Sequence, residues 1–191
     1  MTFDFSEFKN KKIIVTGSST GIGFETGVEF LNLGANVIFH GNQSINDLET
    51  RIKAKSQSQK FKIFKSDFTD LSQVDNFMNN AINYLNGLDI LVNNAGTMVG
   101  RYQLETISEK DFLKIFDLNA KSAYFAIKSA CTIFKEQNYG NIINVSTISA
   151  RTGGSAGSSV YAASKAFVSG ITRSLVSELS PYNIRINAIS P

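Results

Sequence analysis

Short apolar runs alternate with helical patterns along the whole chain, and this alternation constrains the fold more than any other feature of the sequence. The runs at residues 12–16 and 36–39 have the length of strands, whereas residues 22–33 between them carry apolar side chains at helical spacing. Repeats of strand, helix and strand feed a parallel sheet that is covered by helices. We therefore expect residues 1–191 to form a single α/β domain around a doubly wound, Rossmann-like parallel sheet.

The later elements continue in the same order. Further strands are expected at residues 61–65, 88–92, 140–145 and 184–189, and further helices at residues 44–55, 70–85, 109–135 and 161–179. The apolar residues of the helix at 109–135 cover more than one face, which indicates burial against the sheet and against a second surface. A partner subunit would supply that second surface.

Composition and charge exclude several kinds of function. The chain has 42% hydrophobic and 18% charged residues, and its formal charge of +3 is spread rather than clustered, so no nucleic-acid partner is expected. Cys131 is the one cysteine and His40 the one histidine, which argues against a disulfide, a Cys/His metal cluster and Ser-His-Asp chemistry. No run reaches membrane-spanning length, and residues 1–10 lack the apolar core of a signal peptide. We expect a cytoplasmic protein that does not bind membranes.

A glycine-rich turn, Thr16-Gly17-Ser18-Ser19-Thr20-Gly21-Ile22-Gly23, joins the first strand to the first helix. Backbone N–H groups at the start of a helix, together with its positive end, can hold a pyrophosphate. The spacing Gly-x-x-x-Gly-x-Gly differs from the usual dinucleotide fingerprint. Taken alone, the turn is equally compatible with a tight structural turn.

Tyr161 and Lys165 stand at positions i and i+4 in the first turn of the expected helix at 161–179. At this spacing both side chains lie on one helical face, so that the ammonium can approach the phenol oxygen and favour the phenolate. Such a pair can trade protons with a substrate. The same spacing also arises by chance on amphipathic helices.

Taken together, the motifs resemble those of the short-chain dehydrogenase/reductase family. The glycine-rich turn, Asp67 after the third strand, Asn93-Asn94-Ala95-Gly96 after the fourth, Asn119 in the long helix, and Tyr161 with Lys165 occur in the family's order between Thr16 and Pro191. Within the family the chain is similar to 3-oxoacyl-carrier-protein reductases and to sugar and polyol dehydrogenases. The resemblance implies an NAD(P)(H)-dependent oxidoreductase that transfers hydride between nicotinamide and a carbonyl or secondary alcohol. A catalytically silent dinucleotide-binding protein is the alternative.

The resemblance also implies cofactor contacts at the strand ends. The pyrophosphate would lie among Gly17, Ser19, Thr20, Gly21, Ile22 and Gly23, the adenine beside Asp67 and Phe68, and the adenosine ribose beside Asn93, Ala95 and Gly96. Asp67 can accept from the exocyclic amine, and Phe68 can cover a ring. Asn93 and Asn94 can instead satisfy backbone groups at the strand end, an alternative that we favour for Asn94.

The end of the second strand bears on the choice between NAD and NADP. A carboxylate there binds the ribose hydroxyls and repels a 2′-phosphate, and this chain has Gly41 at that position. His40, Asn42, Gln43 and Ser44 around it include no acid, so we expect NADP to be preferred over NAD. The family's usual NADP signals are absent, because Asn42 and Thr20 stand where a basic residue would.

The resemblance implies a catalytic group of Asn119, Thr147, Tyr161 and Lys165. Tyr161 would exchange the proton, Lys165 would assist it and bind the nicotinamide ribose, and Asn119 would hold a water in a proton relay. The family commonly has a serine where Thr147 stands after the fifth strand, and Ser146 and Ser149 are alternative donors if the loop register differs.

Three further expectations concern the substrate and the assembly. Arg101 and Arg151 flank the expected pocket and can either attract an anionic substrate or serve as surface arginines. Helices 109–136 and 161–179 resemble the family's subunit interface, which implies a homodimer or homotetramer. Family members usually continue past Pro191, so we expect a C-terminal substrate lid and the last strand to be absent from this chain.

Overall fold

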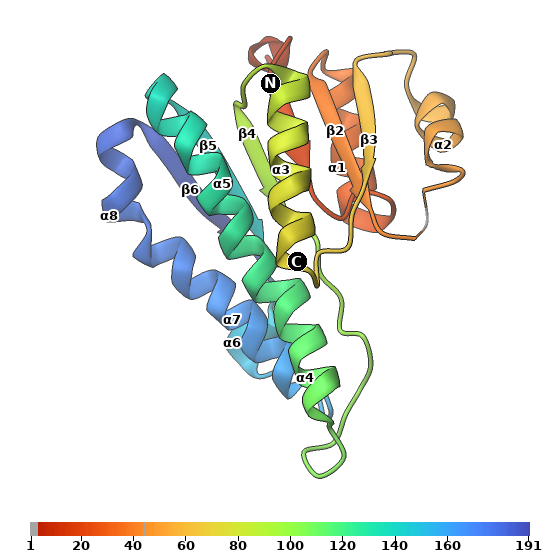
Figure 1. Cartoon of the computed structure of the whole chain (residues 1–191), viewed down its shortest axis with the longest axis vertical. Coiled ribbons are helices and arrows are strands. Elements are labelled where there is room, and N and C mark those ends of the chain that lie inside the picture. The colour runs from red at the N-terminus through yellow and green to blue at the C-terminus, as the bar shows by residue number, and fades with distance from the viewer. Residues whose placement is uncertain (1–3, 44) are drawn as a thin grey trace.

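A computed structural model describes residues 4–43 and 45–191 and contains a single sheet with the strand order β3-β2-β1-β4-β5-β6 (Figure 1). Every neighbouring pair of strands is parallel. The strands are β1 (Lys12–Val15), β2 (Asn36–Gly41), β3 (Phe61–Lys65), β4 (Ile90–Asn93), β5 (Gly140–Val145) and β6 (Ile184–Ile189). The doubly wound α/β architecture expected from the sequence is confirmed, and the strand order reverses between β1 and β4.

Helices cover both faces of this sheet. They are α1 (Gly21–Asn32), α2 (Leu48–Lys55), α3 (Leu71–Leu85), α4 (Glu109–Phe116), α5 (Ser122–Gln137), α6 (Ser149–Thr152), α7 (Ser159–Ser174) and α8 (Val176–Leu179), with short turns η1 (Ser6–Phe8), η2 (Asp117–Lys121) and η3 (Ser180–Tyr182). One apolar core lies between the sheet and α3, α5 and α8, and the other between the sheet and α1 and α2. Within residues 4–43 and 45–191, no helix is long and apolar enough to cross a membrane.

Several boundaries differ from those expected. The helix expected from residue 44 begins at Leu48, and Ser44 itself lies outside the described residues, as do residues 1–3. The last long helix begins at Ser159 and breaks after Ser174. The short helix α6 was not expected, because four residues are too few to show a helical period.

The helix expected at 109–135 is continuous but contains a π-helical turn, η2, between α4 and α5. A π-turn widens the helix locally and is frequently found at functional sites. Asn119 lies in this turn and is fully buried. The interruption therefore falls at the residue that the sequence assigns to the proton relay.

Candidate active site

The glycine-rich turn lies where β1 ends and α1 begins. Gly17 has a φ of +61° and Gly21 a φ of +58°, a left-handed conformation that glycine adopts without strain. Thr20 precedes α1 in an extended conformation, and its side chain makes no capping hydrogen bond to the described residues. The first N–H groups of a helix lack partners within the helix, so those of α1 stay available to an anionic ligand.

This turn packs against the residues that follow β4. A Cβ on Gly17 would stand 2.7 Å from Ala95 Cα, and one on Gly23 would meet the amide nitrogen of Asn94. Asn94 Nδ2 donates to the carbonyl oxygens of Thr16 at 3.0 Å and Gly17 at 2.9 Å. The expectation that Asn94 satisfies backbone groups at a strand end is confirmed. These contacts join the ends of β1 and β4, where a doubly wound sheet binds its ligand.

The residues expected near the adenosine lie at the ends of β2 and β3. Gly41 is buried, and a Cβ there would stand 2.7 Å from Ser19 Cβ. Asp67 Oδ1 accepts from the backbone nitrogen of Thr69 at 2.9 Å and from its hydroxyl at 2.8 Å. Burial raises the pKa of Asp67, but hydrogen bonds from Thr69 and Asn42 outweigh it and leave the pKa below its ordinary value. Asp67 is therefore an ionised acceptor at neutral pH.

Two side chains expected at the cofactor point into the protein. Phe68 is 2% exposed and stacks on His40 at a centroid distance of 4.0 Å, so its ring packs inside the protein instead of lying at an open site. Asn93 Nδ2 donates to Asn144 Oδ1 at 3.0 Å and to the carbonyl of Ala123 at 3.3 Å. The Asn93 side chain thus has the internal hydrogen-bonding role that was considered as its alternative.

Lys165 lies in the first half of α7, one helical turn after Tyr161. It is 4% exposed, and its Nζ donates to the carbonyl of Val145 at 2.8 Å. Burial lowers the pKa of Lys165 to about 8. An amine whose pKa lies this close to neutrality can both carry and release a proton during a reaction.

Asn119 and Lys165 both approach the backbone of Gly96. Its Nδ2 donates to the carbonyls of Ile115 at 2.7 Å and Thr97 at 2.8 Å. Its Oδ1 is buried and has no hydrogen-bond partner in the part of the chain that the structure describes. A Cβ on Gly96 would meet this oxygen and would stand 2.9 Å from Lys165 Nζ. The absence of a side chain at Gly96 therefore lets a buried acceptor without a partner among the described residues and the amine approach the same point of the backbone.

The three hydroxyls after β5 have different surroundings. Ser146 Oγ is buried, donates to the carbonyl of Lys165 at 3.1 Å and lies 2.8 Å from Ser169 Oγ. Thr147 Oγ1 accepts from the backbone nitrogen of Ser149 at 3.3 Å, which leaves its proton free to donate. Ser149 opens α6 instead of following the strand directly. The Ser146 hydroxyl thus bonds to groups inside the protein, whereas the hydroxyl proton of Thr147 has no acceptor among the described residues.

Asn144 and Thr172 were missed by the sequence interpretation. Asn144 Nδ2 donates to Thr172 Oγ1 at 2.9 Å, and Thr172 Oγ1 donates to the carbonyl of Val168 at 2.8 Å. With the Asn93 contacts, this buried chain links α5, β4, β5 and α7. A polar residue inside the apolar strand β5 was the available signal, because a buried amide requires partners.

The loops after β4 and β5 meet at the rim expected for the substrate pocket. Arg101 Nη1 donates to Ser155 Oγ at 2.6 Å and to the carbonyl of Ala156 at 3.1 Å. Arg151 is exposed on α6 and lines a separate groove together with Arg173. Of the two arginines expected at the rim, Arg101 therefore lies in the contact between the loops.

A glycine-rich turn at the point where a parallel strand order reverses defines a dinucleotide-binding α/β protein. The family model described as short chain dehydrogenase matches residues 11–191, and the chain belongs to this family. It is an oxidoreductase of the class that acts on CH–OH groups and uses NAD(P).

Named relatives and solved structures agree with this assignment. The chain is 36% identical to a 3alpha-hydroxysteroid dehydrogenase of Mediterraneibacter gnavus, over 98% of this chain and 75% of the relative. It is 32% identical to a 2-dehydro-3-deoxy-D-gluconate 5-dehydrogenase of Dickeya dadantii, over 100% of this chain and 74% of the relative. The crystal structure of NADH-dependent reductase A1-R' complexed with NAD superimposes with a TM-score of 0.91 at 31% identity, over 98% of this chain and 80% of that one.

Proposed function

We propose that the protein interconverts a carbonyl and a secondary alcohol with NAD(P)(H), and that Tyr161 is the general acid and base. The observation that carries this proposal is the buried amine of Lys165, which lies one turn from Tyr161 and approaches the backbone of Gly96 together with the free Oδ1 of Asn119. When bound, the nicotinamide supplies or accepts the hydride. The protein must then supply or remove one proton at the substrate oxygen.

The residues around Gly96 can supply this proton in one direction of the reaction and remove it in the other. In the reducing direction Thr147 donates a hydrogen bond to the carbonyl oxygen, and Tyr161 gives its proton to the oxygen as the C–O bond becomes that of an alcohol. Lys165 can pass a proton to Tyr161 because its pKa lies at about 8. A water held by Asn119 Oδ1 would connect Lys165 to solvent. In the oxidising direction the same groups carry the proton outward.

The proposed cofactor site uses the N–H groups of Thr20, Gly21, Ile22 and Gly23 for the pyrophosphate and the Asp67 carboxylate for the adenine. Lys165 would also bind the nicotinamide ribose. We propose a preference for NADP over NAD, because Asn42 and Gln43 offer donors to a 2′-phosphate and Gly41 offers no acid. Comparison of kcat/KM for NADPH and NADH tests the preference, and a higher value for NADH would contradict it.

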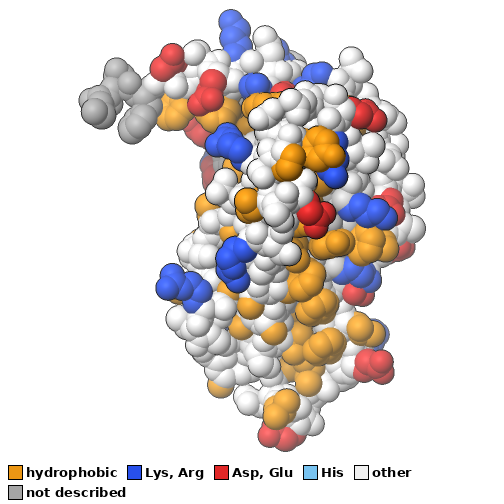
Figure 2. Space-filling model, turned by 90° about the vertical axis from the view of Figure 1, so that its left-hand side faces the viewer, with side chains coloured by type: hydrophobic (Ala, Val, Ile, Leu, Met, Phe, Trp, Pro, Cys, Tyr) orange, Lys and Arg blue, Asp and Glu red, His pale blue; other side chains and the backbone are white. Residues whose placement is uncertain are grey.

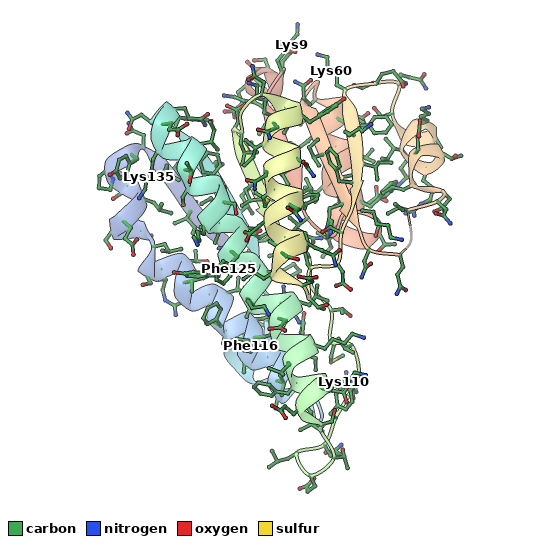
Figure 3. The ribbon with its side chains drawn as sticks, in the orientation of Figure 1. Lys9, Lys60, Lys110, Phe116, Phe125 and Lys135 are labelled. Carbon is green, nitrogen blue, oxygen red and sulfur yellow. The ribbon has the colours of Figure 1, made fainter. Side chains whose placement is uncertain are left out.

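We further propose a homodimer or homotetramer formed through α4, α5 and α7. Phe112, Tyr124 and Phe167 on these helices are 43%, 40% and 37% exposed. Phe116 lies where α4 meets α7 and contacts Phe167 at a ring distance of 5.7 Å (Figure 3). Viewed from the side of α7 and α8, hydrophobic side chains gather along the lower half of the molecule (Figure 2). An apolar surface of this kind is typical of a protein interface.

Sedimentation of the wild type and of Phe167→Asp tests this assembly. We expect the variant to dissociate, since a buried unpaired carboxylate would oppose the interface. Tyr84→Asp is the control, because Tyr84 is 56% exposed on α3 and its ring contacts Phe64 and Lys62 of β3. A monomeric wild type would contradict the proposal.

Tyr161→Phe tests the catalytic role directly. Turnover should fall by about 10³-fold, because general acid–base catalysis contributes about 10²–10⁴-fold, while fluorescence titration with NADPH or NADH should show unchanged binding. Tyr84→Phe is the matched control. Suitable substrates are a 3-oxoacyl thioester, a 3-oxosteroid and 2-dehydro-3-deoxy-D-gluconate. Cofactor binding without any Tyr161-dependent turnover would favour the silent alternative.

A further inference from the structure

The histidine at the end of β2 lies beside the glycine-rich turn and is 3% exposed. Its Nδ1 accepts a hydrogen bond from the backbone nitrogen of Gly17 at 2.9 Å, and its Nε2 lies 3.1 Å from the carbonyl oxygen of Ser66. A carbonyl oxygen can only accept, so Nε2 carries the proton and Nδ1 is bare. His40 is therefore a neutral bridge between the turn after β1 and the residue after β3.

The packing around the ring maintains this neutral form. Phe68 stacks on it at 4.0 Å, and Phe77 contacts it edge-on at 4.8 Å. Burial lowers the pKa of His40 to about 4, although the Ser66 carbonyl and the charge of Asp67 act in the opposite direction. At neutral pH the Nδ1 atom thus remains an acceptor for the Gly17 N–H.

The backbone of His40 holds the next residue of the turn. Ser18 N donates to the carbonyl of His40 at 2.8 Å, and the nitrogen of His40 donates to Ser18 Oγ at 2.8 Å. Ser18 Oγ in turn donates to the carbonyl of Val15 at 2.6 Å. The sequence analysis assigned Gly17 to the pyrophosphate site, but the Gly17 N–H donates its hydrogen bond to His40 Nδ1.

We infer that His40 is a positioning residue for the dinucleotide, which fixes the first half of the glycine-rich turn so that the free N–H groups at the start of α1 face the pyrophosphate. This inference rests on the proposed cofactor site. His40 itself does not touch the cofactor. Its removal should therefore weaken binding by loosening Gly17 and should leave the proton transfer at Tyr161 unchanged.

Two amide substitutions separate the two halves of the bridge. In His40→Asn the side-chain oxygen can occupy the place of Nδ1 and keep the bond from Gly17, while the bond to Ser66 is lost. In His40→Gln the longer amide can reach Ser66 but leaves the Gly17 N–H without an acceptor. Both variants lose the aromatic stacking on Phe68, so this loss cancels when the variants are compared.

We expect His40→Gln to raise the Kd and KM for NADPH or NADH about tenfold relative to His40→Asn, with the same kcat, because a buried unpaired N–H is costly. Equal Kd values in the two variants, or a fall in kcat at unchanged Kd, would overturn the inference.

A measurement on the ligand-free protein is independent of the proposed cofactor site. In the wild type, nitrogen NMR should show His40 as the Nε2–H tautomer, and hydrogen exchange should be slow at the Gly17 amide. Exchange there should stay slow in His40→Asn and become faster in His40→Gln. The Nδ1–H tautomer in the wild type would overturn the inference even if neither variant folds. If the wild type binds no dinucleotide, the cofactor site fails while these readings still decide whether the bridge exists.

Discussion

Gly17 and Gly41, near the ends of β1 and β2, lie where no side chain would fit, whereas Gly153 in the loop after β5 faces open space. A Cβ on Gly17 would stand 2.7 Å from Ala95 Cα, and one on Gly41 would stand 2.7 Å from Ser19 Cβ. Around Gly153, in contrast, no described atom beyond its chain neighbours lies within 4 Å of an added Cβ. Gly17 and Gly41 are thus required by packing, and Gly153 by backbone conformation alone.

This difference has a chemical meaning. Every reaction of the family uses a nicotinamide dinucleotide, NAD or NADP, so the part of the site that binds what the two share can be built into closely packed strand ends. The substrate differs between relatives, and exposed loops such as the one after β5 tolerate change. Substitutions of matched size in the two regions should therefore have very different effects.

Gly23→Ala should have the largest effect. The added Cβ would stand 2.6 Å from the carbonyl oxygen of Gly17 and would collide with the Asn94 amide. We expect NAD(P)H binding to weaken by roughly 100-fold, since a misplaced N–H loses its hydrogen bond to the ligand. Gly170→Ala in α7 is the control, because the φ of Gly170 is not positive and its Cβ would meet no described atom within 4 Å. Equal binding by the two variants in fluorescence titration would contradict the close packing.

Thr147→Val should have the next largest effect. Valine keeps the shape of threonine and removes its hydroxyl, so kcat should fall by about 10²-fold, as on the loss of one donor to a developing oxyanion. Thr147→Ser should restore most of the rate. The same change at Thr152, which is exposed on α6, is the control. If Thr147→Val keeps full kcat in steady-state assays, Ser149 becomes the candidate donor.

The pH dependence of stability tests the packing of His40 beside the glycine-rich turn. The folded-state pKa of His40, about 4, lies below its ordinary value of 6.5, so the unfolded chain binds more protons between these pH values. The contribution of His40 to the free energy of unfolding should be fully present above pH 6.5. It should be lost as the pH drops toward 4, which lowers the free energy of unfolding by on the order of 3 kcal/mol. The difference in the free energy of urea unfolding between the wild type and His40→Asn, measured at each pH, separates this contribution from that of the carboxylates. If the free energy of unfolding depends on pH in the same way in both proteins, the predicted contribution of His40 is contradicted.

Gly153→Ala should have the smallest effect. Gly153 has a φ of +82°, so alanine would be strained by about 1–2 kcal/mol without any steric clash. A lower Tm with unchanged NAD(P)H binding is expected from thermal unfolding and fluorescence titration. Loss of cofactor binding in this variant would show that the two regions are coupled.

The sequence predicted most of the architecture because its signals are local. The strand at Phe61–Lys65 was placed with its observed bounds, and the glycine-rich turn was recognised from its spacing. The direction of individual side chains at strand ends was not predictable. Phe68 lies under His40, and Asn93 bonds to Asn144, because tertiary packing decides which way each points. The start of α2 was misplaced since its polar residues give a weak period.

The candidate site was predicted as a set of residues but not as a geometry. Tyr161 and Lys165 were found from their spacing, which survives in α7. The close approach of Asn119 and Lys165 to Gly96 could not be read from the sequence, because it depends on residues after β4, in η2 and in α7 meeting in space. Ser146 and Thr147 are adjacent in the chain, and only their contacts distinguish them.

The π-helical turn at Asp117–Lys121 also sets the rotational phase of the long helix. It inserts one residue without adding a full turn, so the residues of α5 are rotated by about 100° relative to an uninterrupted continuation of α4. This offset moves the apolar face of α5 around the helix axis relative to that of α4. A single deletion within the turn would restore ordinary α-helical phase and carry the amide of Asn119 away from Lys165. The proposed proton relay therefore depends on the length of the helix at this turn as much as on the identity of Asn119.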